Sequence, residues 1–503
     1  MTIPPSDGDR SVTLGSMSSS SRSEVALGFL HDIERSLGAL DHSSPGSLSI
    51  SGTGSLPSVF ATTDLAVASV AAAGRAAARV VRVQGSGGRR IDVDRRLASM
   101  WFRSTIDPIG WDIPSPWDSV AGVYRAGDRW IRLHTNVPAH RRSALAVLGV
   151  DDDSTDPVDR ETVTAAAAAW AADELESAIV AAGGCAAALR SEEEWRRHPQ
   201  GRAVAAEPLI HVERFAGGAA GAAAEPPAVT PGRPLAGVRV LDLTRVLAGP
   251  VATRFLAGLG ADVLRLDPPD WSEPGVEPDV TRGKRCGRLD LCADGGRATF
   301  LRLLADAQIL VHGYRADALE RLGLGDDVRR TVAPGLIDIG LNAYGWTGPW
   351  RNRRGFDSLV QMSCGIAHTG GRLLGLDPRA GGDADQPEPV PLPVQALDHA
   401  TGYLLATAAL HGWAARLTDG GATTARVSLA RTAHLLLGGP RTEPATEIAG
   451  AVDGDWEPAR EETGWGPARR LRPPVAVDGV DWRWDIPAMP LGGEPTLAWL
   501  DTP

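Results

Sequence analysis

Apolar and polar positions follow their most regular pattern in the middle of the chain. The apolar run Val238–Leu243 is followed by a turn, by an apolar stretch of helical length at Val251–Leu259, and by a second apolar run at Ala261–Asp267. Short apolar runs bounded by turns are typical of buried strands. The pattern therefore predicts a β-α-β unit with two parallel neighbouring strands.

The same alternation continues downstream. It predicts a helix near Gly296–Ala305, a strand at Gln308–Tyr314, a short helix at Ala316–Leu322 and a strand at Leu336–Asn342. Strands that alternate with helices are typical of a parallel sheet covered on both faces. We expect an α/β fold with a doubly wound, Rossmann-like parallel sheet.

The first half of the chain has a different pattern. Short strands are predicted around Val123–Tyr124 and Trp130–His134, and charged helices near Arg160–Ala182 and Ser191–Arg196. This arrangement predicts a smaller α+β domain.

The two halves share one internal similarity. Asp64 and Asp398 each precede an Ala-rich helix, a Gly-containing turn, a strand and a second helix. The distance from Asp64 to Val93 equals that from Asp398 to Val427, at 29 positions. We interpret the chain as a fused, partly duplicated arrangement whose first half is a degenerate copy, with Asp64 as a helix cap.

Low-complexity stretches divide the chain. Phe215–Arg233 is rich in Gly, Ala and Pro and predicts a linker, and Leu376–Pro393 predicts a long surface loop. The expected organisation is a disordered leader at 1–50, a partial copy with the small α+β domain at 51–214, the linker at 215–233, the main sheet domain at 234–440, and a C-terminal tail at 441–503 that packs back on the main domain.

Composition excludes some classes of function. The formal net charge is −11 and the pI is about 5.5, which disfavours binding to nucleic acid or to anionic membranes. No run of about 18 apolar residues is present, as a membrane span requires. The cysteines have no metal-ligand or disulfide spacing, so we expect no metal site and a cytoplasmic protein; they are Cys185, Cys286, Cys292 and Cys364.

Five motifs in the second half occur in one order. They are PLAGVRVLDLTRVLAGPVATRFLAGLGADVLRLDPP, RGKRCGRLDL, LERLGLG, GWTGPWRNRRGFDSLVQMSCG and DHATG. In sequence and order they resemble the class III (CaiB/BaiF-type) CoA-transferases over residues 234–433. The segments 124–136 and 181–203 resemble that family more loosely.

The resemblance implies a role for Asp398, because DHATG holds the position of the family's catalytic aspartate. The carboxylate would attack an acyl-CoA thioester and carry CoA as an aspartyl thioester before passing it to a second acid. The implied substrates are an acyl-CoA and a carboxylic acid, with no permanently bound cofactor. The family forms interlocked homodimers, so we expect a homodimer or an intrachain pseudo-dimer.

The resemblance also implies a CoA site. Four cations match CoA-contacting positions of the family, namely Arg245, Lys284, Arg321 and Arg354, and Tyr314 matches an aromatic residue beside the adenine. Arg285 is a further candidate cation. In the turn after the first strand, the backbone amides of Val246, Leu247 and Ala248 are expected near the thioester. The dinucleotide pattern GxGxxG is missing from this turn.

Two alternatives stay open beside the transferase. The related racemases carry a His-Asp pair where this chain has Phe356 and Asp357, which disfavours proton transfer at an α-carbon. A catalytically degenerate CoA-binding or assembly protein is the second alternative, because the halves are incomplete. His399, next to the proposed nucleophile, is expected to be an exposed helix residue. Donor and acceptor acids cannot be read from the sequence.

Overall fold

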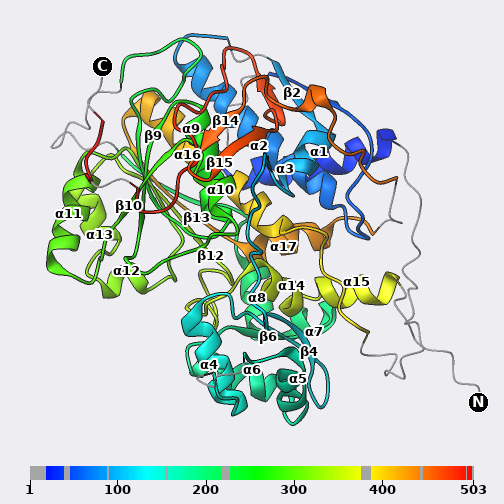
Figure 1. Cartoon of the computed structure of the whole chain (residues 1–503). Helices are drawn as coiled ribbons and strands as arrows, with labels where there is room; N and C mark the ends of the chain where they lie inside the picture. The colour runs from blue at the N-terminus through cyan, green and yellow to red at the C-terminus, as the bar shows by residue number, and fades with distance from the viewer. Residues whose placement is uncertain are drawn as a thin grey trace, which may run out of the picture.

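A seven-stranded sheet forms the centre of the molecule. The computed structural model describes residues 19–38, 46–87, 90–152, 157–216, 227–374, 387–441, 446–493 and 496–500. The strand order of the main sheet is β10-β9-β8-β11-β12-β13-β7, and all neighbours are parallel except β13 and β7 (Figure 1). Its strands are β7 (His211–Phe215), β8 (Arg239–Leu243), β9 (Asp262–Asp267), β10 (Lys284–Arg288), β11 (Ile309–His312), β12 (Ile337–Asn342) and β13 (Ala422–Ser428). The predicted α/β class and parallel sheet are confirmed.

The predicted β-α-β unit is confirmed as β8, helix α9 (Ala248–Gly258) and β9. The chain then continues on the other side of β8, where β11 pairs with it. The strand order therefore reverses between β8 and β11. A crevice at the carboxyl ends of the strands beside such a reversal is the usual ligand site of an open α/β sheet.

Alternate side chains of the sheet enter two different hydrophobic clusters. Val240 and Ile309 pack in the cluster that contains α9 and helix α16 (Ala396–Asp419). Leu241 and Leu310 point the other way and pack with helix α11 (Asp294–Ala305). Both faces of the sheet are thus covered by helices, because strand side chains alternate in direction.

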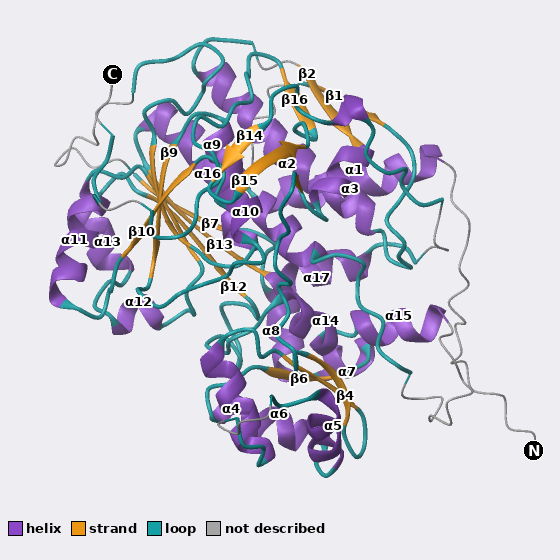
Figure 2. Ribbon diagram, viewed as in Figure 1, coloured by secondary structure: helices purple, strands orange, loops and turns teal. Residues whose placement is uncertain are grey.

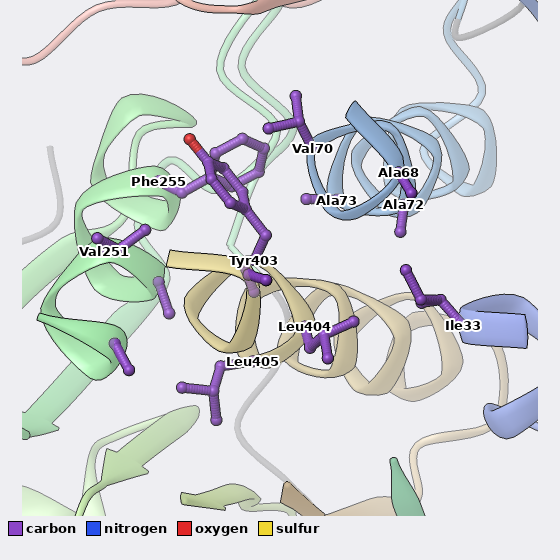
Figure 3. Packing of buried hydrophobic residues seen from close by; sticks show 14 of the residues in the cluster. Ile33, Ala68, Val70, Ala72, Ala73, Val251, Phe255, Tyr403, Leu404 and Leu405 are labelled. Carbon is purple, nitrogen blue, oxygen red and sulfur yellow. The ribbon is translucent and has the colours of Figure 1, made fainter. Parts of the chain in front are cut away.

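Helix α16 packs between α9 and helix α2 (Thr62–Val83), so the two halves share one core. Figure 3 shows Tyr403 and Leu404 of α16 between Phe255 of α9 and the small side chains of α2, among them Ala73. All of these residues are almost fully buried. Alanine on α2 permits a close approach of the two helices, which explains the Ala-rich sequence after Asp64.

Part of the expected leader is folded. Residues Ser19–Ser36 form helix α1, which packs on α2. Phe29, Leu30 and Ile33 are buried there, since their spacing places them on one helical face. The expectation of disorder is therefore wrong for this helix, while residues 1–18 and 39–45 lie outside the described residues.

A small α+β unit lies at one end of the molecule, below the main sheet in Figure 2. Its antiparallel sheet contains β4 (Gly122–Arg125), β5 (Trp130–Leu133) and β6 (Ala186–Ala188). A separate hydrophobic cluster joins this sheet to α4 (Pro138–Leu148), α5 (Arg160–Ala168) and α6 (Ala172–Ala181). The single helix predicted at 160–182 is therefore two helices.

The C-terminal segment packs on both halves. Strand β16 (Val475–Val477) pairs with β2 (Arg90–Asp94), which also pairs with β1 (Ser47–Ser51), and β15 (Gly466–Arg470) pairs with β3 (Ile106–Pro108). The indole of Trp484 donates to the Arg254 carbonyl of α9.

Further elements are α3 (Arg95–Trp101), α7 (Glu192–Arg197), α8 (Pro199–Ala206), α10 (Glu277–Val280), α12 (Ala318–Arg321), α13 (Asp326–Val332), α14 (Asp357–Ser363), α15 (Ile366–Leu374), α17 (Leu429–Gly438) and β14 (Glu461–Thr463).

Two predicted connections fall largely outside the described residues. They are 217–226 of the expected linker and 375–386 of the expected surface loop. The predicted domain boundaries and the predicted duplication therefore stay predictions. Within the described ranges, no helix has both the length and the apolar character that a membrane span needs.

Candidate active site

A cavity of about 630 Å³ opens at the carboxyl edge of the main sheet. Its walls come from the turns after β8, β11 and β12, from the start of α16, and from the start of α4 in the small unit. The predicted site residues that line it are Arg245, Val246, Ala248, Tyr314, Arg321, Arg354 and Asp398. Leu247, Lys284 and Arg285 do not line it.

Asp398 is the third residue of α16 and lies in the wall of this cavity. Its residue surface is 9% exposed. None of the described residues donates a hydrogen bond to its carboxylate. Burial, and then the charge of Asp357, raise the pKa of Asp398 well above its ordinary value. The carboxyl group is therefore poorly solvated and unpaired, which suits a nucleophile more than a structural group.

Asp357 begins α14 and fixes the start of α16. Its Oδ2 accepts the backbone N–H groups of Leu397 at 2.8 Å and of Asp398 at 3.0 Å. Its other oxygen accepts the Gln361 side-chain amide. Burial raises the pKa of Asp357 to about 6 even though these hydrogen bonds oppose the shift. Two carboxyl groups this close titrate as a coupled pair.

Two glycines allow the walls of the cavity to approach each other. A Cβ on Gly402 of DHATG would lie 2.5 Å from the Ala248 carbonyl oxygen, so only glycine lets α16 meet α9 here. A Cβ on Gly249 would lie 2.2 Å from the Thr244 Cβ. These contacts give a physical reason for the glycines in two of the motifs.

The first strand-to-helix turn differs from its prediction in one respect. The Val246 N–H donates to Glu273 Oε2 at 2.8 Å, so this amide is already in use and does not await a substrate. Helix α9 begins at Ala248, and its N-cap Leu247 offers no side-chain hydrogen bond. Ala248, the first residue of α9, lines the cavity, and no side chain of the N-cap bonds this helix start. Negative charge is favoured near such a helix N-terminus.

The Arg245 guanidinium lies between two aromatic rings. Its central carbon is 5.1 Å from the ring centres of both Trp271 and Tyr314, and its Nη2 donates to the Tyr314 hydroxyl at 3.0 Å. Its Nε also lies 3.9 Å from Oδ1 of the buried Asp267. The two rings and this ion pair together hold the guanidinium in one orientation. Arg245 is thus a positioned cation on the cavity wall.

Four further arginines line the same cavity. Arg353 pairs with Glu176 at 2.7 Å, Arg321 is bonded to Asp317 at 3.0 Å, and Arg354 is exposed. The fourth is Arg315, whose pKa is lowered by burial and then by the charges of Arg354 and Arg321. Sequence reasoning missed Arg315, although its place directly after Tyr314 at the end of β11 could have indicated it. Clustered cations of this kind suit a polyanionic ligand.

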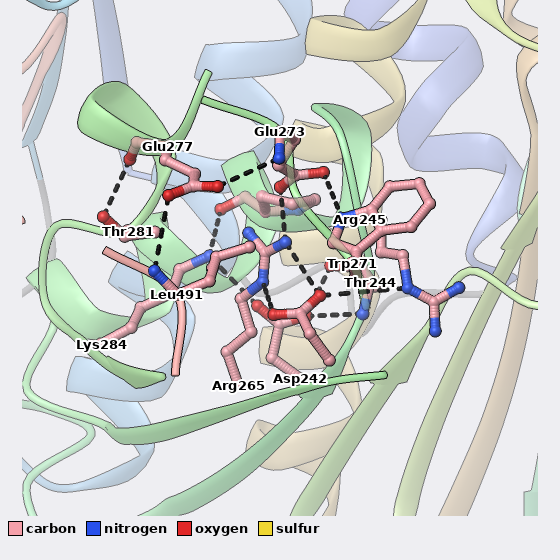
Figure 4. Close-up of polar contacts among 12 residues, drawn as sticks. Asp242, Thr244, Arg245, Arg265, Trp271, Glu273, Glu277, Thr281, Lys284 and Leu491 are labelled. Carbon is pink, nitrogen blue, oxygen red and sulfur yellow. Dashed lines mark hydrogen bonds and ion pairs between the residues drawn. The ribbon is translucent and has the colours of Figure 1, made fainter. Parts of the chain in front are cut away.

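Lys284 does not reach the cavity. It is 1% exposed, and its Nζ donates to Asp242 Oδ2 at 3.1 Å and to the Pro250 carbonyl at 2.9 Å. Figure 4 shows its side chain directed towards Asp242. Arg285 is bonded to Asp262 at the sheet edge. The structure therefore gives both residues internal partners in place of a ligand.

His140 lines the cavity although no sequence pattern predicted it. It belongs to α4 of the small unit, is 9% exposed, and lines the cavity. Burial and then the Arg354 charge lower the pKa of His140 to about 4, so the imidazole is neutral at pH 7. Its ring lies 6.0 Å from that of Phe356, on which His134 stacks at 3.7 Å. Only the packing of the small unit against the sheet brings His140 here.

Two expectations for neighbouring residues are wrong. His399 is 3% exposed and stacks on Phe102 at 5.0 Å, because it points into the interface between the halves. Asp64 is not the N-cap of α2, which is Ala61; it pairs with Arg95 at 2.7 Å. Within the described part of the chain, no group of three or more His, Cys, Asp and Glu side chains is arranged to hold a metal ion.

Part of the chain matches a known protein family. Residues 235–452 match the sequence model of CoA-transferase family III. The acetyl-coenzyme A transferase nodX of Hypoxylon pulicicidum is 36% identical over 205 residues, which are 40% of this chain and 33% of that protein. The succinate–glutarate CoA-transferase of Agrobacterium fabrum is 34% identical over 29% of this chain and 42% of its own length. The matches thus span less than half of either relative.

One solved structure is also similar. The crystal structure of Rv3272 from Mycobacterium tuberculosis, in an orthorhombic form, is 32% identical to this chain. The match covers 41% of this chain and 55% of that one, with a TM-score of 0.36.

Proposed function

Because residues 235–452 of the chain belong to CoA-transferase family III, we propose that the protein moves CoA from an acyl-CoA to a carboxylic acid, with Asp398 as the nucleophile. The observation that carries this proposal is the Asp398 carboxyl group, which is unpaired among the described residues and lies in a cavity beside the uncapped start of α9. A carboxylate suits this task because its acyl derivatives stay activated.

The cavity walls suggest how CoA is held. Arg245, Arg315, Arg321 and Arg354 supply the positive charge that the phosphates of CoA require, and Tyr314 offers a ring face for the adenine. The pantetheine arm would then run along the β8 turn towards Asp398. Lys284 is not part of this proposal, since its ammonium group is used internally.

The reaction proceeds in two symmetrical halves. An Asp398 oxygen attacks the thioester carbonyl, and the C–S bond breaks to give a mixed anhydride and CoA thiolate. The thiolate attacks the Asp398 carbonyl carbon, which releases the first acid as a carboxylate and leaves an aspartyl-CoA thioester. The acceptor carboxylate then attacks this thioester, and the released thiolate attacks the acceptor's carbonyl in the new anhydride. The products are a new acyl-CoA and a free Asp398 carboxylate.

Each tetrahedral intermediate carries an oxyanion. The N-terminal amides of α9 at Ala248 lie in the cavity wall and favour that charge. Water has to be excluded, since it would hydrolyse the anhydride or the thioester. Val137 and His140 of the small unit cover this side of the cavity. The first half of the same chain thus completes the site, which supports an intrachain pseudo-dimer.

The two relatives are named for acetyl and for succinate and glutarate substrates, which differ in size and charge. Substrates are therefore best identified with a panel of acyl-CoA donors and of mono- and dicarboxylic acids.

Asp398→Ala and trapping of the intermediate test the proposal together. We expect Asp398→Ala to lower kcat by about 10⁴-fold or more, as removal of a covalent nucleophile does elsewhere. Hydroxylamine added to the wild-type protein with an acyl-CoA should convert Asp398 into a hydroxamate, detected by peptide mass spectrometry. The peptide that contains Asp64 is the internal control and should stay unmodified.

Three results would count against this proposal. Wild-type turnover in Asp398→Ala would exclude the aspartyl thioester. CoA binding without exchange across the whole acid panel would instead favour a CoA-binding or assembly protein. Deuterium incorporation at the α-carbon of an acyl-CoA would favour the racemase, with the neutral His140 as a base from the small unit.

A further inference from the structure

The turn after β8 contains a strained backbone. Val246 has a φ of +65°, and it is the one non-glycine residue with positive φ among the residues that the structure describes. A β-branched side chain disfavours this left-handed conformation. Such a conformation persists only where its surroundings hold it. The residues around Val246 therefore indicate what maintains the turn.

Glu273 is the direct partner of this turn. Its Oε2 accepts the Val246 N–H and the Trp271 indole N–H, both at 2.8 Å, and its Oε1 accepts Arg265 Nη2 at 2.5 Å (Figure 4). The Glu273 side chain is 7% exposed and that of Arg265 is fully buried. A buried carboxylate with three donors is held rigidly, because any movement breaks several charge-assisted hydrogen bonds.

A buried charge network supports Glu273 from beneath. Arg265 also pairs with Asp267 at 2.9 Å. Asp242 accepts the Thr244 backbone N–H at 2.9 Å and the Lys284 ammonium at 3.1 Å. The turn is thus fixed on both sides, at Thr244 by Asp242 and at Val246 by Glu273.

The turn after β8 also determines the positions of two groups in the cavity wall, the Arg245 guanidinium and the start of α9. Arg245 stacks on Trp271, whose indole N–H is bound by the same Glu273 oxygen. Leu247, directly after the strained residue, is the N-cap of α9. A change at Val246 would therefore move both the stacked guanidinium and the first amides of the helix.

We propose that Glu273 is a positioning residue, which holds Val246 in the left-handed conformation and thereby directs Arg245 and the start of α9 into the CoA cavity. Its consequence for turnover rests on the proposed function, whereas its effect on the turn does not. Glu273 does not line the cavity itself, so it acts through the residues that it bonds, among them Val246 and Trp271.

A glycine at position 246 separates positioning from a general structural role. Glycine adopts positive φ without the side-chain cost, so it needs no partner to stay there. If Glu273 works by holding a strained valine, the effect of Glu273→Gln should be large with Val246 and small in the Val246→Gly background. A role in stability alone would give the same loss in both backgrounds.

The experiment measures kcat and backbone hydrogen exchange in four proteins: wild type, Glu273→Gln, Val246→Gly and the double variant. We expect Glu273→Gln to lower kcat by about 10- to 100-fold, as small displacements of reacting groups do. We expect it to speed exchange in the peptide 244–250 by about tenfold, consistent with one lost hydrogen bond. The double variant should stay within about threefold of Val246→Gly alone in kcat.

Glu457→Gln is the matched control. Glu457 bonds Arg282 at 2.6 Å and 2.9 Å, so this variant also breaks a glutamate–arginine pair, but away from the turn. It should leave kcat and exchange at 244–250 unchanged. Circular dichroism and the melting temperature of every variant show whether it is folded.

The outcomes distinguish this inference from the proposed function. Equal losses of kcat in the two backgrounds, or unchanged exchange at 244–250 in a folded Glu273→Gln protein, would overturn the positioning role while the transferase stands. A wild-type protein without transfer activity, but with faster exchange at 244–250 in Glu273→Gln, would contradict the transferase and keep the positioning of the turn.

Discussion

The two helices that pack together at the centre of the molecule each carry an aspartate in their first turn, and the two aspartates have opposite surroundings. Asp64 in α2 bonds Arg95 at 2.7 Å, and both side chains are less than 10% exposed. Asp398 in α16 has no cation partner among the described residues and instead lies beside a second acid, Asp357. One carboxylate is neutralised in the core, and the other remains available in a cavity.

A single position accounts for much of this difference. Arg95 follows Asp64 by 31 positions, and Leu429 follows Asp398 by the same number. Each is the first residue of the helix that follows the strand, in α3 and in α17. Arg95 donates to Asp64, whereas Leu429 contributes an apolar side chain to the cavity wall.

The comparison shows that the start of an Ala-rich helix does not by itself make a nucleophile. The acid also needs the absence of a counterion and an adjacent ligand cavity. The second half supplies both, since the turn after β8 lies next to Asp398. Asp64 has its Arg95 counterion in place and does not line the cavity.

Among the variants that test this comparison, Leu429→Arg should have the largest effect, which is a loss of kcat. A guanidinium at the place equivalent to Arg95 should pair with Asp398, hold its carboxylate and block the approach of the thioester. We expect kcat to fall by about 10³-fold, which corresponds to about 4 kcal/mol in the barrier. Steady-state kinetics with the preferred acyl-CoA would measure it.

Leu429→Met is the control, because it changes the shape of the wall without adding charge, and its kcat should stay within about threefold of wild type. Equal losses in the two variants would show that packing at this position matters and that the missing counterion does not.

Arg95→Leu is the reciprocal change and should act on stability. It removes the cation of a buried ion pair, so we expect the free energy of unfolding to fall by about 3 kcal/mol. Denaturant titration would measure this loss. In the Asp64→Asn background the same substitution should cost clearly less, because asparagine carries no charge for Arg95 to pair with.

The kcat of the Arg95→Leu proteins tests whether Asp64 takes part in catalysis. Each folded Arg95→Leu protein should keep a kcat close to that of wild type, since neither Arg95 nor Asp64 lines the cavity. A selective loss of kcat without a loss of stability would mean that the first-half aspartate takes part in catalysis.

The sequence predicted the sheet well because its signals are local. The apolar runs of β8, β9, β11 and β12 are continuous and bounded by turns, so their positions were right to within two residues. Asp398 reached the cavity as the motif implied. Lys284 did not, because a cation in a motif carries no sign of whether its partner is a ligand or, as here, the buried Asp242.

The remaining features depend on contacts between distant segments. His140 meets Phe356 only because the small unit packs against the sheet edge, and no local pattern records that contact. The burial of His399 likewise follows from Phe102 in the other half. Helix α1 was hidden by its Ser-rich start, although its apolar residues at 29, 30 and 33 have helical spacing.

The pH dependence of turnover should reveal the influence of Asp357 on Asp398. We expect this to be the smallest effect among the predictions. The nucleophile must be ionised, and both burial and the Asp357 charge raise the pKa of Asp398. The value of kcat/KM should therefore fall as the pH is lowered through this raised pKa, at a pH clearly above the ordinary aspartate value of about 4.

Asp357→Asn should move this acid limb to lower pH, because the charge of Asp357 is one of the two causes that raise the pKa of Asp398. The asparagine carbonyl oxygen can still accept the N–H groups of Leu397 and Asp398, so the start of α16 is kept while the neighbouring charge is removed. The two carboxyl groups titrate as a pair, so the limb belongs to both in the wild type and to Asp398 alone in the variant. A limb that stays in place would mean that burial alone sets the ionisation of the nucleophile, and the second acid would then serve only as a cap for the helix.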